Sequence, residues 1–156
     1  VSKKGYLPIA DESAVIKASG TDVEMSINWG RSTIEARSTQ GPINHVRLCR
    51  EAEVLAGVMF SGAANKENRF GTAWKDCHVP PAPLVTSRGH RELLEPLSLM
   101  TSGEIQKTLL ECALDEFDGY LGVKIAPLHE VTIEERVETV LQSLNVLEDA
   151  HAKAQL

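Results

Sequence analysis

Residues whose side chains could carry acid–base or nucleophilic chemistry gather in one stretch of the sequence, residues 61–91. Cys77 stands next to His78 there, and His90 follows near the end of the stretch. A thiolate is a strong nucleophile and an imidazole exchanges protons near neutral pH, so these three residues are the catalytic candidates. Neighbouring side chains of an extended segment point in opposite directions, which weakens Cys77 and His78 as a cooperating pair.

The same stretch holds side chains suited to an anionic ligand. Ammonium and guanidinium groups bind carboxylates and phosphates through charge-assisted hydrogen bonds, and amides add neutral ones. The ligand-binding candidates are Asn65, Lys66, Arg69, Lys75 and Arg88. The alternative is that these residues are polar only because a surface loop is solvated. On the functional interpretation, the expected ligand is a small-molecule anion.

Motifs for metals and nucleotides are weak or absent. His45 and Cys49 are four residues apart, so a helix would place both on one side, where they could share a metal ion. Structural roles are the better interpretation, because Cys49 fits the apolar side of that helix and His45 fits its first turn. The patterns G-x-G-x-x-G, G-x-x-x-x-G-K-[ST], G-x-S-x-G and H-E-x-x-H do not occur. The sequence therefore predicts no metal site and identifies neither a cofactor nor a known family.

Length and charge restrict the class of protein. The chain of 156 residues is expected to fold as one domain, and its formal net charge of -6 comes without any cluster of Lys and Arg beyond pairs, which argues against nucleic acid as a partner. No segment approaches the roughly 20 consecutive apolar residues that span a bilayer, so no membrane partner is expected. The cysteines, Cys49, Cys77 and Cys112, are widely spaced, as free thiols of a cytoplasmic protein would be.

The strand pattern predicts an α+β fold with a small antiparallel sheet. Val23, Met25 and Ile27 alternate with polar residues, a turn follows at residues 28–30, and residues 33–37 alternate again. Residues 22–38 are therefore predicted to form a β-hairpin. A further strand is predicted at about 121–126.

About three helices are predicted to pack on that sheet. The first runs over residues 44–59 with Asn44 as its N-cap, although its apolar end, residues 58–60, would also suit a buried strand. The other two, over residues 103–117 and 132–150, begin at Ser/Thr-x-x-Glu capping boxes formed by Thr101 with Glu104 and by Thr132 with Glu135. A short helix capped by Asp11 is also predicted over residues 10–18, where a strand is the alternative.

Residues 61–91 form a long irregular segment, since Gly62, Gly71, Pro80, Pro81, Pro83 and Gly89 interrupt any period. Long ordered loops in compact domains are often binding loops, lids or arms that reach a neighbouring subunit. The first hypothesis is accordingly a small cytoplasmic enzyme or small-molecule-binding subunit of a homo- or hetero-oligomer, with its site built around this segment. The alternative is a non-catalytic interaction or accessory subunit that docks through the C-terminal helices. The sequence leaves open whether the protein is an enzyme.

Overall fold

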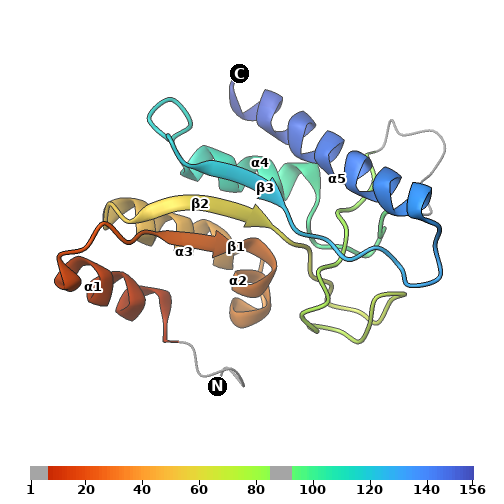
Figure 1. Cartoon of the computed structure of the whole chain (residues 1–156), viewed down its shortest axis with the longest axis horizontal. Helices are drawn as coiled ribbons and strands as arrows, with labels where there is room; N and C mark the ends of the chain where they lie inside the picture. The colour runs from red at the N-terminus through yellow and green to blue at the C-terminus, as the bar shows by residue number, and fades with distance from the viewer. Residues whose placement is uncertain (1–6, 85–92) are drawn as a thin grey trace.

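Three parallel strands backed by helices form the centre of the chain in the computed structural model, which describes residues 7–84 and 93–156 (Figure 1). Along the described residues the elements are α1 (Ile9–Ser19), β1 (Met25–Asn28), α2 (Trp29–Ala36), α3 (Gln40–Glu51), β2 (Leu55–Phe60), α4 (Ser102–Glu111), β3 (Tyr120–Val123) and α5 (Ile133–Ala154). None of the helices in these two ranges is long and apolar enough to cross a bilayer.

The sheet has the order β1-β2-β3 and every pair of neighbours is parallel. Ile27 lies opposite Val58, and Val58 lies opposite Leu121. The prediction of an antiparallel sheet is therefore wrong. Parallel neighbours need a crossover connection rather than a tight turn. Here α2 and α3 connect β1 to β2, and α4 lies in the connection from β2 to β3.

The predicted hairpin over residues 22–38 is half strand and half helix. Its first strand is confirmed as β1, but α2 replaces the second. The Asn28 side chain caps this helix by accepting a hydrogen bond from the Arg31 backbone N–H at 3.0 Å, and the Thr33 hydroxyl donates to the Trp29 carbonyl. A good cap and the burial of Trp29 outweigh the alternating pattern of residues 33–37.

The helix predicted over residues 44–59 divides into α3 and β2. It begins earlier, at Gln40, because Pro42 is tolerated in the first turn of a helix. Glu53 then adopts a left-handed conformation with φ of 56°, which reverses the chain into the strand. The alternative of a buried strand at residues 58–60 is thus correct.

The C-terminal elements follow the sequence pattern more closely. Thr101 caps α4 and Thr132 forms a complete capping box with Glu135 at the start of α5. The helix α4 ends earlier than expected, at Glu111, and β3 covers residues 120–123 rather than 121–126. The short helix over residues 10–18 is confirmed as α1.

The core lies on one face of the sheet. Strand residues Met25, Ile27, Val58 and Phe60 are buried there against residues from α3, α4 and α5, namely Val46, Cys49, Ile105, Leu109, Val146 and Leu147. In Figure 1 the strands lie in front of α3 and α4. Trp29 is fully buried, and its indole N–H donates to the Thr108 hydroxyl at 3.0 Å, which connects the start of α2 to α4.

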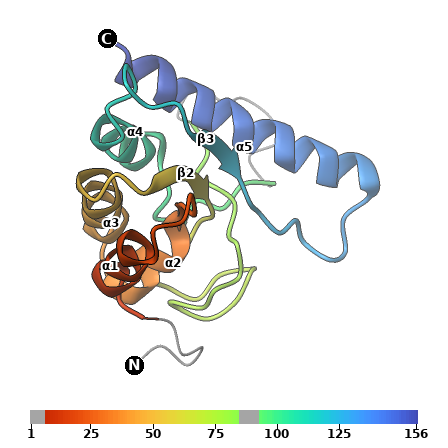
Figure 2. The ribbon, with the colours of Figure 1, turned by 60° about the vertical axis from the view of Figure 1, so that its left-hand side comes forward.

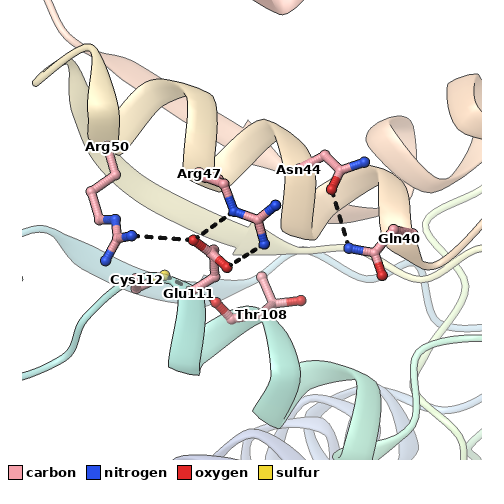
Figure 3. A network of polar contacts seen from close by, with 7 residues as sticks. All are labelled: Gln40, Asn44, Arg47, Arg50, Thr108, Glu111 and Cys112. Carbon is pink, nitrogen blue, oxygen red and sulfur yellow. Dashed lines mark hydrogen bonds and ion pairs between the residues drawn. The ribbon is translucent and has the colours of Figure 1, made fainter.

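A carboxylate on α4 connects that helix to α3 (Figure 3). Glu111 accepts hydrogen bonds from Arg47 Nε and Nη2 at 3.1 and 2.8 Å, and from Arg50 Nη2 at 3.2 Å. The hydrogen bonds from Arg47 lower the pKa of Glu111, and the nearby positive charges of Arg47 and Arg50 act in the same direction. Ionised Glu111 therefore stabilises the contact between α3 and α4.

We expect Glu111→Gln to remove a pH-dependent part of the stability. Because the pKa of Glu111 is lower in the folded state, its contribution is fully present above the unfolded value of about 4.3 and is lost as the pH falls through the folded value. The variant should melt about 2–4 °C lower at pH 7, and the difference should shrink as the pH falls below the unfolded value. Thermal melts across this range test it, with Glu148→Gln, an exposed glutamate of α5, as control. An equal loss in melting temperature at low pH and at pH 7 would contradict a stabilising role for ionised Glu111.

The segment after β2 is held in place by hydrogen bonds over residues 61–84. Gly62 and Val79 exchange two backbone hydrogen bonds, and the Trp74 N–H donates to the Ala64 carbonyl at 2.8 Å. Arg69 ties the segment to residues 94–95: its Nε lies 3.4 Å from a carboxylate oxygen of Glu95, and its Nη2 donates to the Leu94 carbonyl at 2.7 Å. Glu95 is only 3% exposed, so this ion pair anchors the segment to the body of the protein.

Arg69→Met should destabilise the protein, because it removes a guanidinium that pairs with the buried Glu95 carboxylate. The expected loss in the free energy of unfolding is about 2 kcal/mol, measured by chemical denaturation. Lys66→Met, at an exposed position of the same segment, is the matched control. Adding Glu95→Gln to Arg69→Met should recover part of the loss, since the buried group is then uncharged. A loss as small as that of the control would mean that the ion pair does not anchor the segment.

Candidate functional site

A polar cluster lies where β1 and β2 end. We call it the His78 cluster, and its members are Arg31, Ser61, Asp76 and His78. Arg31 lies in the first turn after β1, Ser61 directly follows β2, and Asp76 and His78 belong to the irregular segment. In parallel α/β sheets and barrels, ligands bind at the carboxyl ends of the strands. The cluster thus occupies the edge of the sheet where sites are usually found.

The four side chains form a continuous chain of contacts. Arg31 Nη2 lies 3.3 Å from Asp76 Oδ2, and Asp76 Oδ1 lies 3.4 Å from His78 Nδ1. The Ser61 hydroxyl lies 3.0 Å from the same ring nitrogen. An ionised carboxylate can only accept a hydrogen bond, whereas the Ser61 hydroxyl can donate to Nδ1 or accept from it.

Close backbone contacts fix the frame of the cluster. A Cβ at Gly30 would lie 2.2 Å from the Ser61 carbonyl oxygen, and a Cβ at Gly62 would lie 2.2 Å from the Val79 carbonyl oxygen. Only glycine allows these approaches. The start of α2, the end of β2 and the strand-like pair at Gly62 and Val79 are therefore packed backbone against backbone.

His78 itself sits in a left-handed conformation, with φ of 54°. Trp74 is also left-handed, with φ of 59°, and its ring lies 5.0 Å from the Arg37 guanidinium. Such conformations are uncommon for residues other than glycine, and they persist where the surroundings determine the backbone. The His78 carbonyl accepts a hydrogen bond from the Ala126 N–H at 2.8 Å, which fixes the turn against the chain that follows β3.

The arrangement is not that of a serine nucleophile. In a Ser-His-Asp triad the hydroxyl and the carboxylate contact opposite ring nitrogens, whereas Ser61 and Asp76 both approach Nδ1 of His78. Ser61 is also fully buried. The chemistry that this geometry suits is proton transfer by an oriented imidazole.

The other predicted catalytic residues do not join the cluster in the part of the chain that the structure describes. Cys77 Sγ donates to the Lys75 carbonyl at 3.3 Å, and burial raises the pKa of the Cys77 thiol. A reactive cysteine needs a lowered thiol pKa, so these features do not favour Cys77 as a thiolate nucleophile. His90 lies outside the described residues.

The predicted ligand-binding residues are dispersed. Asn65, Lys66 and Lys75 are exposed, and Arg69 forms the ion pair with Glu95. Arg88 lies outside the described residues. Among the candidates that the structure describes, His78 alone is placed in the cluster. Its partners Arg31, Ser61 and Asp76 are not among the predicted site residues. Ser61 directly follows β2 and Arg31 lies in the first turn of α2, a signal that depends on recognising the strands as parallel.

His45 and Cys49 have separate surroundings. His45 Nδ1 lies 2.8 Å from the Ser32 hydroxyl, and burial lowers the pKa of His45. Cys49 is buried in the core, with its sulfur near that of Met25. Among the described residues, no group of three His, Cys, Asp or Glu side chains could hold a metal ion.

Comparisons with known proteins show a family without an assigned function. The model of the family described as "Domain of unknown function (DUF4862)" matches residues 1–139. The chain is 30% identical over 149 residues to the "Uncharacterized protein STM3670" of Salmonella typhimurium (strain LT2), and the match covers 95% of this chain and 43% of that protein. The chain thus spans less than half the length of that relative. No solved structure matches it significantly. This chain therefore belongs to the family of domain of unknown function DUF4862.

Proposed function

We propose that this chain carries the proton-transfer site of a small-molecule enzyme, with His78 as the general acid–base. The observation that supports it is the chain of contacts from Arg31 through Asp76 to His78 at the carboxyl edge of a parallel sheet. A carboxylate that accepts the Nδ1 proton fixes the tautomer of an imidazole and leaves Nε2 as the proton acceptor. A 3.4 Å contact is long for a hydrogen bond, but such contacts often shorten when a substrate binds.

Each partner of His78 has a distinct role in this proposal. Asp76 stabilises the imidazolium that forms when Nε2 takes a proton from the substrate, and Arg31 orients Asp76 through their ion pair. The Ser61 hydroxyl fixes the ring from its buried position. Asp76, Arg31 and Ser61 are thus positioning residues.

The substrate class in the proposal is a small polar molecule that carries a carboxylate or a phosphate. Lys75 is exposed directly beside Asp76 in the sequence and supplies a cation of the kind that holds such groups. The described cysteines are free thiols, which fits the cytoplasm as the place of this activity. We include in the proposal that a partner, rather than a second copy of this chain, completes the site.

We expect His78→Gln to reduce turnover by at least about 100-fold. Turnover of a panel of sugar phosphates and hydroxy acids by the wild-type chain would be followed by NMR, and His129→Gln, an exposed histidine, is the control. The melting temperature should change little, since His78 is partly exposed. Turnover by the variant at the wild-type rate would contradict the assignment of His78.

A second measurement is independent of the substrate. Nitrogen-15 chemical shifts of the free protein should show His78 as the tautomer protonated at Nδ1. Asp76→Asn should reduce the population of that tautomer, whereas Asp115→Asn, a control at an exposed carboxylate, should leave it unchanged. A wild-type ring protonated at Nε2 would contradict the proposed role of Asp76.

A further inference from the structure

One face of the sheet carries no layer of helices. Successive residues of a strand point to opposite faces, so the residues that alternate with the buried ones lie on this face. We call them the open face: Ser26, Asn28, Gly57, Met59, Tyr120 and Gly122. None of these six belongs to the hydrophobic core. Tyr120 is 47% exposed, and a Cβ at Gly122 would meet no atom within 4 Å. On this face Ser26 and Tyr120 are exposed, and Gly57 is buried beneath the Tyr120 ring.

Tyr120 gives the open face a defined shape. Its ring lies across Gly57 of the central strand, where a Cβ would come within 2.5 Å of the ring, and its hydroxyl donates a hydrogen bond to Ser26 on β1. One side chain thus connects β3 to β1 over β2. A large aromatic group held in a fixed place and still half exposed is typical of a surface that packs against another layer.

The helix that follows β3 has an unpartnered apolar side. Ile133, Val137, Val140 and Leu141 are 74%, 53%, 38% and 49% exposed. Their spacing places them on one side of α5, which we call the α5 stripe. The buried side of the same helix consists of Thr139, Ser143, Val146, Leu147 and Ala150. Figure 2 shows the N-terminal half of α5, which carries the stripe, extending beyond the other elements.

Parallel sheets are rarely left open in this way. They occur almost only where both faces are covered. Sheets wound with helices on both faces reverse their strand order, whereas the wall of a barrel keeps the strands in chain order with all helices outside. The order β1-β2-β3 and the single buried face match the barrel wall. Within the described residues, β1 and β3 each have one neighbouring strand only.

We propose that the open face, the outer edge of β3 and the α5 stripe form one interface for further β/α units. The partner is an extended apolar strand that pairs in parallel with β3, followed by an amphipathic helix whose apolar side covers the α5 stripe. Additional units of this kind extend the sheet and enclose Tyr120 and Met59 inside a barrel. The length of the Salmonella relative, of which this match covers 43%, has room for such units. This inference does not depend on the chemistry proposed for His78.

The first test compares this chain by itself with the same chain inserted into the Salmonella relative. Val137→Lys with Leu141→Lys should leave the melting temperature of the isolated chain within about 2 °C of the wild type, because both residues are exposed. In a chimera that carries this chain in place of the matching region of the Salmonella protein, the same two substitutions should lower the melting temperature of the chimera by about 5 °C or more. Asn145→Lys, on an exposed position of α5, is the control in both settings. If the two substitutions changed the melting temperature of the chimera as little as that of the isolated chain, the proposal would be overturned.

A second copy of this chain is the competing occupant. Light scattering of the isolated chain distinguishes the two, because the proposal predicts a monomer at micromolar concentration. A dimer that becomes a monomer on Val137→Lys with Leu141→Lys would assign the surface to self-association and overturn the proposal.

A further measurement does not require the chimera to fold. In the intact Salmonella protein, all amides of the strand that aligns with Tyr120–Val123 should exchange slowly, since the strand has neighbours on both sides. In the isolated chain, the amides of β3 that point away from β2 should exchange at least about 100-fold faster than those bonded to it. Fast exchange of alternate amides in the intact relative would show an open edge there and overturn the proposal.

Discussion

Parallel pairing of β2 with both of its neighbours is the constraint on which the rest of the structure depends. Because the strands run the same way, each connection must cross the length of the sheet, and the helices α2, α3 and α4 lie in these crossovers. All of the strands therefore end at the same edge. The residues that follow β1 and β2 meet there even though they are distant in sequence, and this is how Arg31 comes to contact Asp76.

The sheet buries its side chains against helices on one face and leaves the other face without a helical layer. Phe60 and Val58 are completely buried on the helical side, while Met59 between them points to the other side. The ion pairs between α3 and α4 lie outside this core, where Glu111 contacts its two arginines (Figure 3). The fold thus has one well-formed layer interface, and the second interface that a parallel sheet requires is the one we assign to further β/α units.

Local signals in the sequence predict local structure well. The N-cap at Thr101 and the capping box at Thr132 mark the starts of α4 and α5, because a cap acts within four residues. Strand direction is different, because it depends on partners far away in the sequence. The alternating pattern of residues 33–37 predicts a strand, and a strand there implies a hairpin and an antiparallel sheet. An antiparallel sheet does not bring Ser61 and Arg31 to one edge, so the same pattern conceals the site. The side-chain chemistry of His78 identifies that residue, whereas its partners can be identified only from the topology.

The contact of Gly30 with the Ser61 carbonyl has a mechanical consequence. With no side chain between them, the first turn of α2 and the peptide after β2 have no free space in which to slide toward each other. A shift of Ser61 toward α2 must therefore displace that helix as well, and Trp29 anchors the helix by its hydrogen bond to Thr108 on α4. Any displacement at the ring of His78 that moves Ser61 in this direction would be transmitted, through rigid backbone contact, to the far side of the core.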